Sequence, residues 1–212
     1  MTATIVRSRA ITELLHFTTN RGITGILATK AIKARDRLSA EAYLEHILML
    51  NCPDRSRDAA WHDYVNLSIS QITTLIGPST GHWHPDFDGW WCIMSIDPEV
   101  LSHDGVVFCT TNNMYSGCRR ARGPEGLEAL FADSVTQWSS SRSRSVANRP
   151  PERHASIPTC IQAEALYPVE VPYQYIRRIY TRSEEHSDAI QAMCGALDIP
   201  PIACEVQLRH FE

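Results

Sequence analysis

The segment "PTCIQAEALYP", residues Pro158–Pro168, has the two-residue alternation of a β-strand. Its predicted faces are Ile161, Ala163, Ala165 and Tyr167 on one side, and Gln162, Glu164 and Leu166 on the other. The carboxylate of Glu164 therefore falls in the middle of a neutral strand. Glu164 is either a solvent-facing residue on a half-exposed strand or a functional group. Other features of the sequence are needed to distinguish these two interpretations.

Working outward, the same alternation predicts further short strands, and helical spacing predicts helices between them. Strands are expected around residues 14–17, 64–72, 90–96, 106–111, 173–183 and 202–211, and helices at 19–32, 39–50, 124–138 and 183–197. The arginine-rich stretch 139–156 has few apolar residues and is expected to be a mobile loop. Because no parallel βαβ rhythm is visible, the fold class is predicted as α+β with a largely antiparallel sheet.

Composition bounds the class of protein. A chain of 212 residues with 43% apolar and 21% charged residues is expected to form one globular domain, residues 1–212. We expect no signal peptide, and no segment approaches the roughly 20 apolar residues of a membrane span. The seven cysteines are odd in number and form no C-x-x-C pair. This favours reduced thiols and a cytoplasmic location.

The basic residues are almost all arginines. Of 20 Lys and Arg residues, only Lys30 and Lys33 are lysines, although the net charge is −4. The planar guanidinium fork binds phosphate oxygens in pairs and stacks on bases, so this bias is consistent with a nucleotide or nucleic-acid ligand. A coding bias towards arginine codons explains it equally well.

Motif searches exclude most familiar chemistries. The loop "HWHPDFDG" offers His82, His84, Asp86 and Asp88, but no second cluster has ligand spacing, so we expect no metal. No nucleophile elbow, P-loop, dinucleotide fingerprint or H-E-x-x-H motif occurs. Three separated polar positions remain: His16 in "LLHFTT", an arginine in "PDRSRD", and Glu164.

This combination resembles the DarT family of DNA ADP-ribosyltransferases, the toxin half of bacterial toxin–antitoxin pairs. The resemblance lies in "LLHFTTNRGITGIL", "PDR…D…YVNLSI", "CIMSIDPEVL", "VVFCTTNN" and, most specifically, "QAEALYPVEVPYQYIRRIY". It implies an ADP-ribosyltransferase-like fold, in which two packed, mostly antiparallel sheets with flanking helices form a cleft for NAD. NAD is the substrate, and no metal is implied.

The resemblance also assigns roles to residues. Glu164 matches the catalytic glutamate, and the arginine that contacts NAD phosphate and supports catalysis is either Arg57 or Arg55, with Arg57 favoured by counting back from "LSI". His16 matches the histidine that binds the NAD ribose or adenosine side, and Thr18 and Tyr64 are expected beside it. The loop at about 139–158 matches the segment that recognises the acceptor nucleotide, with Arg142, Arg144, Arg149 and Arg153 as expected DNA contacts.

The chemistry fits these roles. Breaking the nicotinamide–ribose bond leaves positive charge on the ribose, which a carboxylate such as Glu164 stabilises. Single-stranded DNA is the expected acceptor because the modified base has to leave the duplex stack, and a macrodomain-type antitoxin that removes the ADP-ribose is the expected partner. The alternatives are an NAD glycohydrolase, a protein ADP-ribosyltransferase, or a non-catalytic nucleic-acid-binding module. The sequence leaves open whether thymine or guanine is modified.

Overall fold

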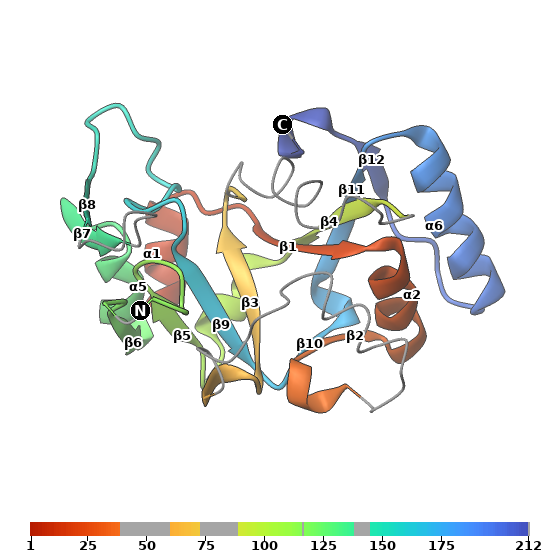
Figure 1. Ribbon diagram of the computed structural model, residues 1–212, viewed down its shortest axis with the longest axis horizontal. Coiled ribbons are helices and arrows are strands. Elements are labelled where there is room, and N and C mark those ends of the chain that lie inside the picture. Colours follow the sequence, from red (N-terminus) through yellow and green to blue (C-terminus); the bar gives the residue numbers. More distant parts are fainter. Residues whose placement is uncertain (39–59, 73–88, 116, 138–144, 212) are drawn as a thin grey trace.

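The computed structural model of the chain describes residues 1–38, 60–72, 89–115, 117–137 and 145–211 (Figure 1). Within them, an eight-stranded sheet has the order β12-β11-β4-β1-β3-β9-β5-β6. The strands of one half are β1 (Leu14–Thr19), β4 (Trp91–Ile96), β11 (Ile176–Thr181) and β12 (Cys204–Val206). Those of the other half are β3 (Tyr64–Ile69), β5 (Val107–Cys109), β6 (Arg120–Arg122) and β9 (Glu164–Pro168).

In the described part of the chain, the two halves are paired to each other only at one end of β1 and β3. Their register pairs are Leu14 with Ile69 and Leu15 with Ser68, after which the strands separate. On its other side β1 pairs with β4 along its whole length, from Leu14 to Thr19. In Figure 1, β1 runs across the molecule while β3 and β9 run steeply past it. The predicted antiparallel α+β fold is confirmed. The two sheets that were expected are instead two diverging halves of a single sheet, because hydrogen bonds between β1 and β3 join them.

Four helices accompany the sheet in the described part of the chain: α1 (Thr2–Ser8), α2 (Asn20–Thr29), α5 (Gly123–Ala129) and α6 (Glu184–Ala196). Polar caps fix two of their starts, since Thr19 Oγ1 accepts from the Gly22 amide at 3.2 Å and Ser183 Oγ from the His186 amide at 3.3 Å. None of these helices is long and apolar enough to cross a membrane.

All four helices pack on the same face of the sheet. Val6, Ile23, Leu127 and Ile190, one from each helix, belong to the main hydrophobic cluster. The strands contribute alternate residues to this cluster, for example Val65, Leu67 and Ile69 of β3. The opposite face carries two smaller clusters, one around Leu15, Ile93 and Phe211 and the other around Cys109 and Leu166, and no residue of the four helices belongs to either.

Short elements complete the description. Strand β2 (Ala31–Lys33) pairs with β10 (Glu170–Pro172), and β7 (Ser134–Gln137) pairs with β8 (Ser145–Asn148). The 3₁₀ turns are η1 (Arg35–Arg37), η3 (Pro98–Ser102), η4 (Tyr173–Tyr175) and η5 (Leu208–His210).

Several sequence-based boundaries were wrong. The helix predicted over 124–138 ends at Ala129, and the residues after it form β7. The stretch expected to be a mobile loop contains β8, because β7 supplies it with a hydrogen-bonding partner. The strand predicted from Pro158 begins at Glu164, and β12 pairs parallel to β11 through α6, a βαβ unit that the sequence did not reveal. The predicted helix 39–50 lies outside the described residues.

Candidate functional site

Glu164 is the first residue of β9, which lies between β3 and β5. It is opposite Ser68 of β3 on one side and opposite Cys109 of β5 on the other. Alternation along β3 places Tyr64, Asn66 and Ser68 on the face away from the main core, and each of them is half-buried. Glu164 is half-buried on the same face, so its carboxylate lies on the side of the sheet that the described helices leave uncovered.

Asn66 connects Glu164 to His16. The side-chain amide of Asn66 donates from Nδ2 to Oε2 of Glu164 at 2.5 Å. The main-chain oxygen of Asn66 is 3.0 Å from Nδ1 of His16. A carbonyl oxygen only accepts, so Nδ1 of His16 carries the proton and Nε2 is the acceptor of the neutral ring.

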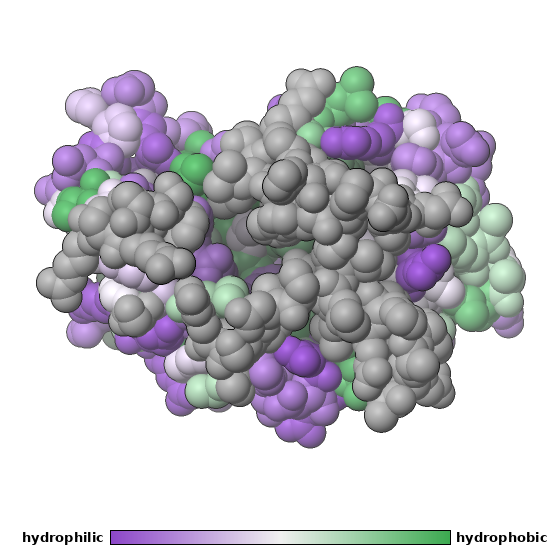
Figure 2. All heavy atoms as spheres, viewed as in Figure 1, coloured by the Kyte–Doolittle hydropathy of each residue, from purple (hydrophilic) through white to green (hydrophobic). Residues whose placement is uncertain are grey.

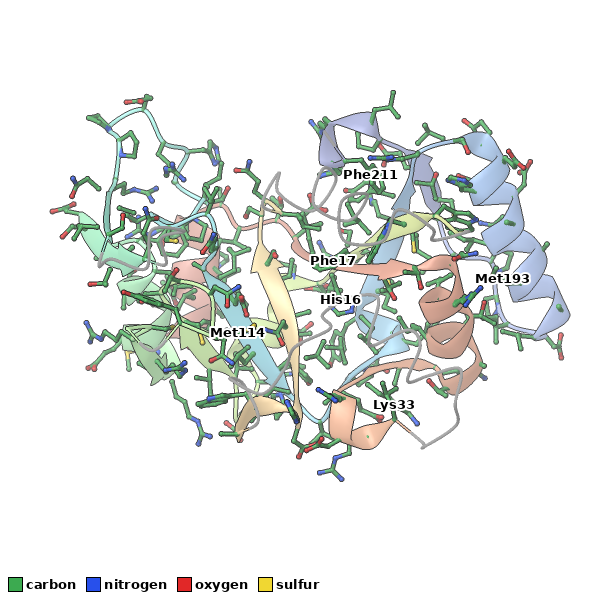
Figure 3. All side chains as sticks on the ribbon, viewed as in Figure 1. His16, Phe17, Lys33, Met114, Met193 and Phe211 are labelled. Atoms are coloured by element: carbon green, nitrogen blue, oxygen red, sulfur yellow. The ribbon has the colours of Figure 1, made fainter. Side chains whose placement is uncertain are left out.

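His16 reaches this carbonyl because of the split in the sheet. The last pair between β1 and β3 is Leu15 with Ser68, and His16 follows directly. Beyond that pair the His16 ring, rather than a backbone amide of β1, meets the Asn66 carbonyl. His16 therefore lies where the two halves of the sheet diverge (Figure 3). The predicted pair of His16 and Glu164 is brought to one place through a residue that the sequence analysis did not select.

The other predicted cofactor residues flank this centre. Thr18 is two residues beyond His16 on β1, opposite Cys92 of the main hydrophobic cluster, and the residue is 3% exposed. Tyr64 is two residues before Asn66 on the same face. Its hydroxyl accepts from Nη2 of Arg122 at 3.3 Å, and its ring lies 5.3 Å from that of Trp61.

Arg120 is the second residue on this face that sequence reasoning missed. It is opposite Cys109, which is itself opposite Glu164. Its Nε donates to Oδ1 of Asn113 at 2.7 Å, and its guanidinium lies 5.6 Å from the centre of the Trp61 ring. Its Nη1 and Nη2 also donate to the main-chain oxygens of Cys118 and Asn113, so Arg120 is a cation fixed two strands from Glu164 that holds the segment before its own strand.

The thiol beside Glu164 is neutral. A hydrogen bond with Cys118, burial, and the charges of Cys118 and Glu164 raise the pKa of Cys109 well above its usual range. The same hydrogen bond is the largest cause that lowers the pKa of Cys118, to about 6. Cys109 therefore adds no negative charge next to the Glu164 carboxylate.

The predicted arginines divide into two groups. Arg55, Arg57, Arg142 and Arg144 lie outside the described residues, as do the four residues of the H-x-H loop. Arg149 donates to the carbonyls of Ile157 at 2.8 Å and His154 at 2.9 Å, and Arg153 donates to that of Pro158 at 3.1 Å. Both guanidinium groups thus fasten the turn that leads towards Glu164. The described residues contain no group of three or more potential metal ligands.

The set of groups on this face fits a dinucleotide substrate. The Glu164 carboxylate can accept from a ribose hydroxyl, and Trp61, Tyr64 and Tyr115 offer partly buried rings next to the Cys109–Leu166 cluster. Arg120 adds positive charge to this face, with its donors bound to the segment from Asn113 to Cys118. Figure 2 shows hydrophilic side chains around the described rim of the molecule, at the β7–β8 end and at the α6 end.

Comparison with known proteins gives one family. The sequence matches the family described as "DarT: ssDNA thymidine ADP-ribosyltransferase" over residues 15–211. A comparison with curated protein sequences finds no match.

Solved structures share the fold. Thermus sp. 2.9 DarT in complex with NAD+ superposes with a TM-score of 0.63 at 18% identity, covering 95% of this chain and 98% of that chain. The same protein in complex with ADP-ribosylated ssDNA gives a TM-score of 0.60 at 17% identity, covering 96% and 97%. Thermosipho africanus DarTG in complex with ADP-ribose gives 0.57 at 16% identity, covering 94% of this chain and 51% of that chain.

Proposed function

This chain belongs to the DarT family of ssDNA thymidine ADP-ribosyltransferases, and on that premise we propose that it transfers ADP-ribose from NAD to single-stranded DNA and releases nicotinamide. The observation that carries this is the family match over residues 15–211, which includes His16, Asn66 and Glu164. Among the bases that the sequence left open, the family description favours thymine as the acceptor.

Glu164 is the catalytic residue in this proposal. When the bond between nicotinamide and ribose breaks, positive charge develops on the ribose, and the Glu164 carboxylate stabilises it. In the same proposal the carboxylate accepts a hydrogen bond from a ribose hydroxyl and takes the proton that the attacking base nitrogen loses. Its hydrogen bond from Asn66 favours the ionised form that these tasks require.

His16 and the arginines bind the substrate. With Nδ1 of His16 donating to the Asn66 carbonyl, Nε2 is the ring atom suited to accept from a ribose hydroxyl. Arg57 or Arg55 is proposed as the pyrophosphate ligand, because a permanently charged fork suits phosphate oxygens. Thr18 and Tyr64 are proposed as further contacts of NAD.

The segment before Glu164 is proposed to bind the acceptor strand. Arg142 and Arg144 contribute positive charge for the DNA backbone and planar groups that stack on bases. Arg149 and Arg153 add to this charge while they donate to the carbonyls of the turn. Because a base has to leave the duplex before its ring nitrogen can react, single-stranded DNA is the economical acceptor.

A macrodomain-type antitoxin with ADP-ribosyl glycohydrolase activity is the proposed partner. The present chain covers 51% of the Thermosipho DarTG chain, so about half of that chain has no counterpart in this one. We also propose a cytoplasmic location, because the two substrates, NAD and DNA, are both present in the bacterial cytoplasm.

The experiment is an incubation of the purified protein with NAD and single-stranded oligonucleotides, analysed by mass spectrometry. One set of oligonucleotides contains thymidine, and a matched set has every thymidine replaced by deoxycytidine. We expect the mass of one ADP-ribose on the thymidine-containing strands only, and fragmentation should place it on thymine.

Three results would contradict the proposal. NAD consumption with unmodified DNA would indicate an NAD glycohydrolase or a protein ADP-ribosyltransferase. DNA retention without nicotinamide release would indicate a non-catalytic binding module. Modification of the strands without thymidine would support DNA ADP-ribosylation but contradict thymine as the acceptor base.

A further inference from the structure

Asn66 makes one contact with each of the two site residues, and it uses a different group for each. Its side-chain Nδ2 donates to Oε2 of Glu164, and its main-chain oxygen accepts from His16. Asn66 is diagonal to Glu164 across β3 and β9, since Ser68 is the residue directly opposite Glu164. An asparagine side chain is long enough to reach a diagonal neighbour in an antiparallel pair, whereas serine is short.

We infer that Asn66 is a positioning residue for ADP-ribosyl transfer: its amide fixes the orientation of Glu164 and keeps the carboxylate ionised. The inference rests on the proposed function, because Glu164 is the residue that Asn66 acts through.

The physical reason is the freedom of a glutamate side chain. Its rotatable bonds allow many carboxylate positions, and electrostatic stabilisation of a developing charge is effective only when the group is already in place. A donor on Oε2 removes most of that freedom. It also favours the charged form of the carboxylate, because an amide N–H donates to a carboxylate and cannot take up a proton.

The two contacts of Asn66 can be separated by substitution. The contact with His16 comes from the main chain, so it survives a change of the side chain. Asn66→Ala therefore removes the hydrogen bond to Glu164 and keeps the main-chain contact with His16. Asn66→Asp keeps the shape but replaces the donor with a second carboxylate, and two adjacent carboxylates raise the pKa of one of them.

The experiment follows nicotinamide release by the full chain in the presence of single-stranded DNA, for the wild-type protein and both variants, across pH. We expect Asn66→Ala to lower kcat about tenfold or more while KM for NAD changes little. We expect Asn66→Asp to move the acid limb of the kcat profile up by about one pH unit or more. Thr4→Asp adds the same charge at an exposed position of α1 and should leave the profile unchanged.

Circular dichroism and thermal melting establish that each variant is folded. A wild-type kcat in Asn66→Ala, or an unshifted acid limb in Asn66→Asp, would overturn the inference. Nicotinamide release reports on Glu164 whichever acceptor is used. An unmodified DNA strand would therefore contradict the proposed function while the variant ratios still test Asn66. A wild-type protein that releases no nicotinamide would overturn both.

Discussion

At the scale of single residues, the neighbours of Glu164 suit a carboxylate that has to stay charged. Asn66 donates to it, Cys109 beside it is a neutral thiol, and Arg120 lies beyond Cys109 on the same face. Each of these three residues comes from a different strand. The combination favours the ionised form of Glu164 without placing a second full negative charge against it.

His16 gives a prediction at this scale. Because the proposal assigns it to binding rather than to bond breaking, His16→Ala should raise KM for NAD about tenfold and lower kcat much less. Steady-state nicotinamide release at varied NAD concentration measures both constants. His62→Ala, another half-buried histidine, is the control. A His16 variant with an unchanged KM and a much lower kcat would show that the ring acts in the chemical step instead.

Sequence reasoning found Glu164 and His16 but not Asn66. The first two stand out, Glu164 as a charge inside a neutral strand and His16 as a polar residue between Leu15 and Phe17. Asn66 occupies an ordinary polar position in "YVNLSI", where alternation explains it as the outer face of a half-buried strand. Only the register of β3 against β9 shows that this outer face meets Glu164.

At the scale of elements, β7, β8 and the turn after β8 are tied together by hydrogen bonds. The pairing of β7 with β8 ends at Ser134 and Asn148, and the Arg149 amide then donates to the Asp133 carbonyl at 2.8 Å. The Arg149 guanidinium closes the turn on His154 and Ile157, and the Thr159 hydroxyl donates to Ala132 at 2.6 Å. Side-chain to main-chain hydrogen bonds thus fasten this segment in addition to the backbone pairing of β7 with β8.

Arg149 can be tested by a substitution that keeps its charge. Lysine lacks the planar fork that reaches two carbonyls at once, so Arg149→Lys should lose a contribution of about 1–2 kcal/mol to the order of the turn. We expect limited proteolysis between residues 149 and 158 to become about tenfold faster, and the affinity for single-stranded DNA to fall. Arg7→Lys in α1 is the matched control. Wild-type affinity with faster proteolysis would show that DNA binding needs the charge at Arg149 and not the turn.

Most strands and the helices α2 and α6 could be predicted because each has a local signal. β3 alternates cleanly, and α6 begins at a serine cap followed by two glutamates. The residues after α5 gave no such signal. "FADSVTQW" is compatible with a helix, and it becomes β7 only because β8 supplies a partner from a segment that is poor in apolar residues.

At the scale of the whole molecule, the split in the sheet places the site. β1 is paired to β4 throughout and to β3 at one end only, so a polar histidine and a polar strand face meet where the halves part. The described helices pack on the face opposite Asn66 and Glu164, whereas His16 is opposite Met94 of the main cluster and reaches the Asn66 carbonyl through the split. Such a join depends on pairings between distant segments, which the sequence pattern does not show, and the two sheets expected here were implied by the family resemblance.

The arginine-rich segment gives a prediction for the protein as a DNA-binding molecule. If Arg142 and Arg144 each contact a phosphate, the double variant Arg142→Gln, Arg144→Gln should lower the steepness of log K against log salt by about 1.4, at about 0.7 per contact on a single strand. Fluorescence anisotropy with a labelled oligonucleotide over a salt series measures the slope. Replacement of Arg7 and Arg35 is the control. An unchanged slope with full transfer activity would assign DNA binding to other residues.

The central claim is that Glu164 performs ADP-ribosyl transfer, and a single-turnover rate tests it most directly. Glu164→Gln keeps the size of the side chain and removes its charge, and Glu184→Gln in the exposed first turn of α6 serves as the control. We expect the Glu164 variant to keep NAD affinity close to that of the wild type and to transfer ADP-ribose to single-stranded DNA about 10²-fold more slowly or worse. Transfer at the wild-type rate would contradict the account.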